Sequence, residues 1–165
     1  MAIKKSELYS SLWASCDELR GGMDASQYKD YVLFMLFIKY ISDKYADSDD
    51  FAPPVVIPKG ASFKINTQII QPLINANSRL ARTDFPDFDD PNKLGDGPAM
   101  VARITNLIAI FQKPELDFAK NRAEHDDILG DAYEYLMRHF ASESGKSKGQ
   151  FYTPSEVSRV ISQVI

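Results

Sequence analysis

The chain has 165 residues, of which 44% are hydrophobic and 25% are charged, so it is long enough to bury the core of one domain. Its formal net charge of −4 is the opposite of the basic surface expected of a module that binds nucleic-acid phosphates unaided. The single cysteine, Cys16, excludes an internal disulfide, and the sequence lacks a signal-peptide pattern, so we expect a cytoplasmic protein. The longest apolar run, 31–38, is far shorter than the roughly 20 residues that span a bilayer, so we expect no membrane span.

The first part of the chain predicts two helices. Apolar residues recur at helical spacing before the Gly21-Gly22 pair, which ends the first helix. Asp24 and Gln27 have the spacing of a capping box and predict the start of a second helix. This second helix is strongly apolar and ends before the acidic run 47–50.

The next segment is rich in proline and predicts irregular structure. Residues 51–64 hold three prolines around the apolar triplet 55–57, which indicates an extended loop or a short edge strand. A helix is expected over 66–80, where Pro72 would kink or shorten it because proline cannot donate an internal hydrogen bond.

Residues 83–98 form an acidic, proline-rich loop. Clustered aspartates can bind a divalent cation, but the spacing of a calcium-binding loop is absent, so we expect no metal. We expect instead that Phe85 and Phe88 anchor this loop on the core.

Two further helices are expected, one beginning at Pro98 and one over 127–142. Each carries an apolar stripe that predicts burial in the core: Met100, Val101, Ile104, Leu107, Ile108 and Phe111 in the first, and Leu129, Ala132, Tyr133, Leu136, Met137 and Phe140 in the second. His125 and His139 have no partner at metal-ligand spacing, so surface or capping roles are expected for both.

A polar stretch, 142–149, predicts a hinge or linker before the last helix. Within it Lys146 and Lys148 are the candidates for local contact with DNA, and the alternative is that they are solvated surface charges. Thr153 is a good N-cap and Pro154 suits the first helical position, so a helix is predicted from Pro154. The free backbone N–H groups at its start favour an anionic ligand.

The string Gly149-Gln150-Phe151-Tyr152-Thr153-Pro154, followed by a Ser-Glu-Val helix, resembles a segment of the adenine-N6 DNA methyltransferases that serve as modification subunits of type I restriction-modification systems. The likeness extends upstream to 19–24, 39–43 and 129–136, and it covers nearly the whole chain. One departure is Gly22, where the family more often has asparagine.

The resemblance implies S-adenosylmethionine as cofactor and methyl transfer to adenine N6 in DNA. It places these residues in the cofactor site: Gly149, Gln150, Phe151, Tyr152, Thr153 and Pro154. The family's Gly-rich loop and its catalytic Asn-Pro-Pro-aromatic motif are not found up to Ile165, so no catalytic residue is assigned. The implied partners are DNA, a specificity subunit, a second modification subunit and a restriction subunit.

These observations predict an all-α fold, a compact domain of about five to six helices with long proline-rich loops. We expect a helical amino-terminal domain over 1–141, a hinge over 142–149, and the start of a Rossmann-like S-adenosylmethionine-binding domain over 150–165. The 165 residues alone are then expected to be inactive. The alternative is a free-standing all-helical protein-interaction module.

Overall fold

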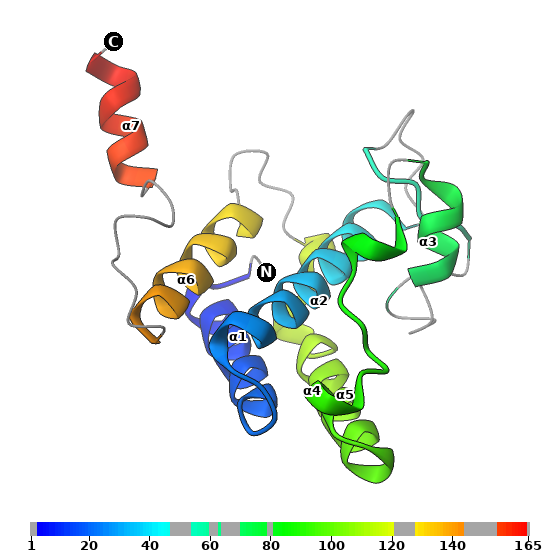
Figure 1. Cartoon of the computed structure of the whole chain (residues 1–165). Helices are drawn as coiled ribbons and strands as arrows, with labels where there is room; N and C mark the ends of the chain where they lie inside the picture. The colour runs from blue at the N-terminus through cyan, green and yellow to red at the C-terminus, as the bar shows by residue number, and fades with distance from the viewer. Residues whose placement is uncertain are drawn as a thin grey trace.

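The computed structural model describes residues 3–46, 54–59, 63, 70–78, 81–120, 128–143 and 155–164. Within these ranges the chain is entirely helical and forms no strand, which confirms the predicted all-α class (Figure 1). The α-helices are α1 (Lys5–Arg20), α2 (Ala25–Tyr45), α3 (Ile70–Ala76), α4 (Pro91–Leu94), α5 (Gly97–Phe111), α6 (Ile128–Glu143) and α7 (Ser155–Val164). Three short 3-10 helices are η1 (Arg82–Asp84), η2 (Pro114–Leu116) and η3 (Phe118–Lys120).

Helices α1 and α2 lie at the centre of the fold. α1 contacts α2, α5 and α6, and α2 contacts α5, α6 and η3, so the two central helices are covered from both sides (Figure 1). One row of α1 is completely buried, with its members about one helical turn apart, and it comprises Leu8, Leu12, Cys16 and Leu19. No helix within the described ranges is both long enough and apolar enough to cross a membrane.

The predicted capping box at the start of α2 is present. The Asp24 carboxylate accepts the backbone N–H of Gln27 at 3.2 Å, and the Gln27 side-chain oxygen accepts the backbone N–H of Asp24 at 3.2 Å. Two N–H groups that the helix itself cannot satisfy are therefore paired. This arrangement fixes the point at which the chain leaves the Gly21-Gly22 turn and enters the helix.

Replacing Asp24 by alanine should lower the free energy of unfolding by about 1 kcal/mol, the usual effect of removing an N-cap side chain. Urea denaturation followed by circular dichroism measures the change. Glu115→Ala is the matched control, because Glu115 is exposed and its side chain caps no helix in the described hydrogen bonds. An equal loss in the two variants would contradict the capping role of Asp24.

The apolar triplet 55–57 does not form the short edge strand that its composition allowed. The side chain of Asn77 takes the place of a neighbouring strand: it accepts the N–H of Val56 at 2.9 Å and donates to the C=O of Val56 at 2.8 Å. Asn77 directly follows α3, so this helix and the loop are tied together. Pro72 lies in the first turn of α3, where its missing N–H has no intrahelical partner to lose. The helix ends at Ala76, before the predicted end at 80, and residues 66–69 lie outside the described residues.

The acidic loop is anchored by its phenylalanines, as predicted. The ring of Phe85 is buried edge-to-face against Phe34, with centroids 4.9 Å apart, and Phe88 packs edge-to-face on Tyr31 at 5.1 Å. The loop also contains α4, which the sequence analysis missed. The Asp90 carboxylate caps this short helix by accepting the backbone N–H of Asn92 at 3.0 Å. Pro91, the residue after Asp90, occupies the first helical position.

Most residues of the two predicted apolar stripes lie in the core or pack against it, but Val101 and Tyr133 do not. Val101 is 64% exposed and Tyr133 is 49% exposed, so their predicted burial is wrong. In α5, Val101 lies about 80° around the helix from the buried Phe111. In α6 the buried residues are Ile128, Ala132, Leu136, Met137 and Phe140, and Tyr133 is exposed although it lies one turn before Met137.

Candidate functional site

The predicted cofactor segment, Gly149–Pro154, lies outside the described residues. The same holds for Lys146, Lys148 and His125. Helix α6 continues to Glu143, so the first two residues of the predicted hinge 142–149 belong to a helix, and the rest of that hinge lies outside the described ranges.

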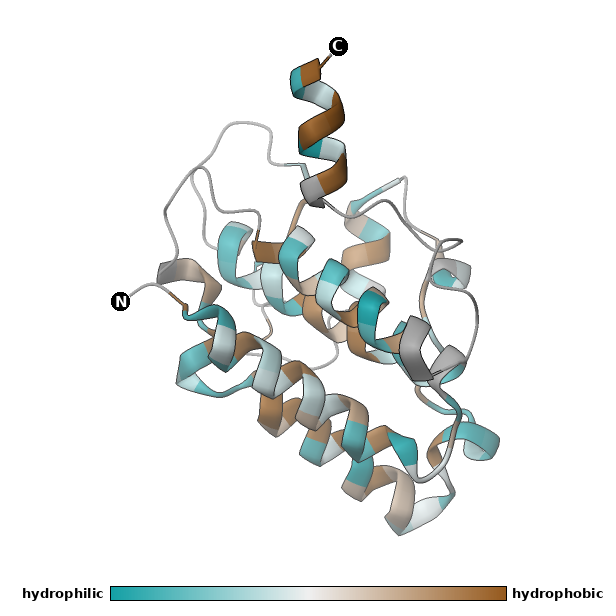
Figure 2. Cartoon of the chain, turned by 90° about the vertical axis from the view of Figure 1, so that its left-hand side faces the viewer, coloured by the Kyte–Doolittle hydropathy of each residue, from teal (hydrophilic) through white to brown (hydrophobic). Residues whose placement is uncertain are grey.

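Helix α7 (Ser155–Val164) directly follows the predicted cofactor segment, and the predicted start, Pro154, lies outside the described residues. The helix is strongly amphipathic, and Figure 2 shows apolar residues repeating along it. Its apolar residues follow the i, i+3, i+4, i+7 spacing of a single helix face, and all are exposed: Val157, Val160, Ile161 and Val164. A stripe of this kind is typical of a helix that packs against another structural element.

The segment 39–43, which carries part of the family resemblance, forms a buried ion pair. Lys39 is 3% exposed and Asp43 is 1% exposed, and the Lys39 ammonium contacts the Asp43 carboxylate one helical turn away in α2. Isolated buried charges are very unfavourable, so this pair persists only because the partners neutralise each other. The ammonium also lies 5.9 Å from the ring centre of Phe63, within the range of a cation–π interaction.

The same segment connects α2 to two distant parts of the chain. Asp43 Oδ2 accepts the backbone N–H of Phe118 at 3.0 Å, and Ser42 Oγ accepts the backbone N–H of Phe63 at 2.5 Å. The other Asp43 oxygen, Oδ1, is buried and has no hydrogen-bond partner among the residues that the structure describes. These charges are too deeply buried to reach a substrate, so the segment 39–43 holds the fold together. The sequence signal that could have found it is a lysine and an aspartate four residues apart in an otherwise apolar helix.

The first resemblance segment, 19–24, is also structural. Leu19 and Met23 are buried in the core, while Gly22 lies against the side chain of Arg103 from α5. A Cβ atom at Gly22 would lie 2.0 Å from Arg103 Nη1 and 2.7 Å from the backbone oxygen of Lys93. Glycine is therefore required here by the close approach of α5 and α4.

The segment 129–136 lies in α6 and packs on α1. Tyr135 stacks on Tyr9 with ring centres 4.2 Å apart and an interplanar angle of 4°. Burial raises the pKa of both phenols, so neither is a candidate proton donor near neutral pH. The exposed end of this contact carries an ion pair between Lys5 and Asp131 at 2.5 Å.

His139 is partly exposed and contributes to the packing between two helices. Its ring meets Trp13 of α1 edge-to-face at 4.0 Å, and the guanidinium of Arg20 lies 4.8 Å from the centre of the same indole. His139 is thus part of an aromatic contact between α1 and α6. Periodicity alone does not show which residues of two distant helices will face each other. Across the described ranges, histidine, cysteine and carboxylate side chains form no group of three that could hold a metal ion.

Comparison with known proteins identifies the relatives of this chain. Residues 124–165 match the family model described as N-6 DNA Methylase, and this range contains the predicted cofactor segment and α7. The methylase subunit of the type I restriction enzyme MpnII from Mycoplasma pneumoniae is 26% identical over 211 residues, covering 93% of this chain and 38% of that protein. The chain is similar to type I restriction enzyme methylase subunits.

Further relatives agree with this identification. The methylase subunit of MjaIX from Methanocaldococcus jannaschii is 23% identical and covers 96% of this chain and 35% of that protein. A crystal structure of a type I restriction-modification methyltransferase subunit from Streptococcus thermophilus has a TM-score of 0.66 and 26% identity, covering 98% of this chain and 44% of that one. The chain therefore spans less than half the length of each of these relatives.

Proposed function

We propose that this chain is the amino-terminal helical domain of a type I restriction-modification DNA methyltransferase subunit, together with the first helix of its catalytic domain. The complete subunit transfers a methyl group from S-adenosylmethionine to adenine N6 in DNA. The observation that carries the proposal is the match of 124–165 to the N-6 DNA methylase family, because that range contains the Gly149–Pro154 string. The structural likeness over 98% of the chain supports it and disfavours a free-standing interaction module.

The proposed layout follows the end of α6: the helical domain lies in 1–143, a hinge in 144–149 and the start of the S-adenosylmethionine-binding domain in 150–165. The exposed stripe of α7 supports this layout. A helix with Val157, Val160, Ile161 and Val164 in solvent packs well against the sheet of a Rossmann-like domain, which would bury that stripe.

The cofactor is proposed to contact the segment Gly149–Pro154. α7 begins at Ser155, so the backbone N–H groups of its first turn have no intrahelical partner and favour an anionic group at this end. This fits the carboxylate of S-adenosylmethionine, with Thr153 nearby and with Phe151 and Tyr152 as apolar walls. The bound cofactor supplies the methyl group, and the catalytic motif is contributed by the rest of the subunit.

DNA, a specificity subunit, a second modification subunit and a restriction subunit are the proposed partners of the complete protein, in the cytoplasm. The net charge of −4 means that DNA contact by this chain is local at most, with Lys146 and Lys148 as the candidates. The helical domain supports the contacts between subunits and around DNA.

Isothermal titration of S-adenosylmethionine into the complete subunit tests the cofactor site. Thr153→Ala and Tyr152→Ala should each weaken binding by about tenfold, since each removes one polar or apolar contact, equivalent to about 1.4 kcal/mol. Ser158→Ala, on the polar face of α7, is the control and should bind as the wild type does. The 165-residue chain alone should bind weakly or not at all. Unchanged affinity in both variants, or tight binding by the chain alone, would contradict the proposed site.

A further inference from the structure

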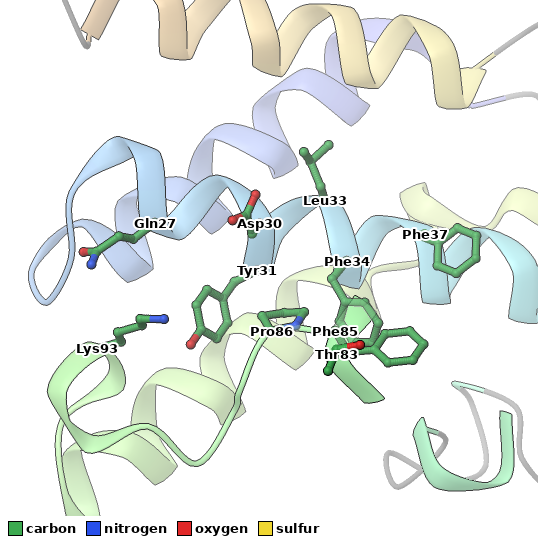
Figure 3. Close-up of a pocket in the computed structure, with 10 residues that line it drawn as sticks. All are labelled: Gln27, Asp30, Tyr31, Leu33, Phe34, Phe37, Thr83, Phe85, Pro86 and Lys93. Atoms are coloured by element: carbon green, nitrogen blue, oxygen red, sulfur yellow. The ribbon is translucent and has the colours of Figure 1, made fainter. Parts of the chain in front are cut away.

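A groove runs between α2 and the loop that carries η1 and α4, on a part of the surface that the proposed function does not use (Figure 3). Its volume is about 540 Å³, which is large enough for one or two amino-acid side chains. The apolar part of its lining comprises Leu33, Phe34, Phe37, Phe85 and Pro86. Figure 3 shows that the polar residues Gln27 and Lys93 lie at the opposite end from Phe37.

The two walls of the groove are held together by direct contacts. Phe34 of α2 packs edge-to-face on Phe85 of the loop, and the hydroxyl of Tyr31 donates to the backbone oxygen of Asp87 at 2.6 Å. Both Phe34 and Phe85 are only 8% exposed, whereas Phe37 is half-buried and offers a ring face to an incoming group. The groove is therefore preformed, and binding does not need to order its walls.

The polar end of the groove is acidic. Asp30 is exposed and forms no ion pair with the residues that the structure describes, while Lys93 on the opposite wall is paired with Asp90 at 3.6 Å. Burial, followed by the charges of Asp90, Asp87 and Asp30, raises the pKa of Tyr31 to about 12. Lys93 offsets the charge of Asp90, and Arg82, 3.6 Å from Asp87, offsets the charge of Asp87. The carboxylate of Asp30 is therefore the charge at this end that a cationic group can pair with.

The apolar lining and the carboxylate of Asp30 indicate which class of ligand fits the groove. The acidic end and the net charge of −4 repel the phosphates of nucleic acid. A neutral apolar ligand would leave the carboxylate of Asp30 without a partner, whereas an arginine or lysine would pair with it. Adjacent apolar and cationic side chains are a feature of polypeptide segments.

We propose that this groove binds a segment of a partner protein in which an aromatic or branched apolar side chain lies next to an arginine or lysine. The apolar side chain packs against Phe37 and Phe85, and the cation contacts Asp30. The Tyr31 oxygen, whose proton is already donated to Asp87, remains available as an acceptor. The groove is thus a protein-docking site, separate from the proposed cofactor segment.

Fluorescence anisotropy with labelled peptides tests the proposal on the 165-residue chain. The probe is the peptide Gly-Arg-Leu-Arg-Phe-Arg-Gly, and the comparison probes replace all arginines by glutamate or both apolar residues by serine. The arginine-containing apolar peptide should bind, and both comparison peptides should bind at least about tenfold more weakly. Absence of binding by the first peptide, equal binding by the glutamate peptide, or preferred binding of a short labelled DNA duplex would overturn the proposal.

Peptide binding by variants of the chain tests whether the peptide binds in this groove. Asp30→Lys should weaken binding of the first peptide about tenfold by reversing the charge that its arginine contacts. Phe37→Ser should also weaken binding of this peptide about tenfold, because it removes an apolar wall of the groove. Glu115→Lys makes the same charge change at an exposed residue outside the groove and should leave affinity nearly unchanged. Circular dichroism confirms that each variant is folded. Equal weakening by Asp30→Lys and Glu115→Lys would show that only net charge matters and would overturn the site.

Discussion

Replacing Lys39 by alanine is expected to lower the free energy of unfolding by about 3–5 kcal/mol, the usual effect of removing one partner from a buried ion pair. The reason is that Asp43, only 1% exposed, would keep its charge in the core without the neighbouring ammonium. Its Oδ1 already lacks a hydrogen-bond partner, so no local donor compensates for the loss. The contact between Lys39 and the Phe63 ring would be lost as well.

Urea denaturation of two further variants separates charge imbalance from loss of packing. The double variant Lys39→Met, Asp43→Asn should be clearly more stable than Lys39→Ala, because it removes both charges and keeps an acceptor for the Phe118 N–H. Lys29→Ala makes the same substitution on a less buried part of α2 and should have a small effect. If Lys29→Ala and Lys39→Ala destabilise equally, the ion pair does not stabilise the fold.

Gly22→Asn is expected to destabilise the protein by about 1–3 kcal/mol, the usual cost of placing extra atoms in a closely packed region. A Cβ atom at Gly22 would lie 2.0 Å from Arg103 Nη1, and 2.7 Å from the oxygen of Lys93. The end of the arginine side chain can move aside, but the Lys93 oxygen belongs to the backbone of α4. The substitution therefore has to displace α4 or the turn before α2.

Thermal and urea denaturation of Gly21→Asn provides a close control for this prediction. Gly21 is the preceding residue, its φ is −70°, and a Cβ there would meet only Arg103 Nη2 at an ordinary 3.5 Å. Gly21→Asn should therefore be better tolerated than Gly22→Asn. Adding Arg103→Ala to Gly22→Asn should restore part of the stability. Equal effects at both glycines would mean that helix propensity or turn preference, and not the approach of α4 and α5, determines the choice of glycine.

Features that depend on a few neighbouring residues could be predicted from the sequence. The capping box of Asp24 and Gln27, the end of α1 at the Gly21-Gly22 pair and the start of α5 near Pro98 each follow from local backbone chemistry. The anchoring of Phe85 and Phe88 was predictable too, because large aromatic residues in a polar loop gain by burial.

Features that join distant residues could not be predicted in this way. The Asp43 carboxylate meets the N–H of Phe118, and Asn77 pairs with Val56, through contacts that only the folded chain creates. The contact of His139 with Trp13 likewise depends on the packing of α6 against α1. The groove combines α2 with the loop around Phe85, so its shape and charge emerge only when the two segments pack.

The candidate cofactor site stays a prediction, and it rests on the resemblance to a known family and not on geometry. The pattern of Thr153 and Pro154 predicts a helix start, and α7 begins at Ser155. An aromatic pair before a capped helix occurs in many proteins, so this pattern alone does not specify S-adenosylmethionine. The match of 124–165 to the N-6 DNA methylase family supplies the support for that proposal.

Transfer of a tritium-labelled methyl group from S-adenosylmethionine to DNA tests the proposed function most directly. The complete subunit, assembled with its specificity subunit, should label adenine N6, and Tyr152→Ala should slow labelling at limiting cofactor. The 165-residue chain under the same conditions should label nothing. Methyl transfer by the chain alone, or no transfer to adenine by the assembled complete subunit, would contradict the account.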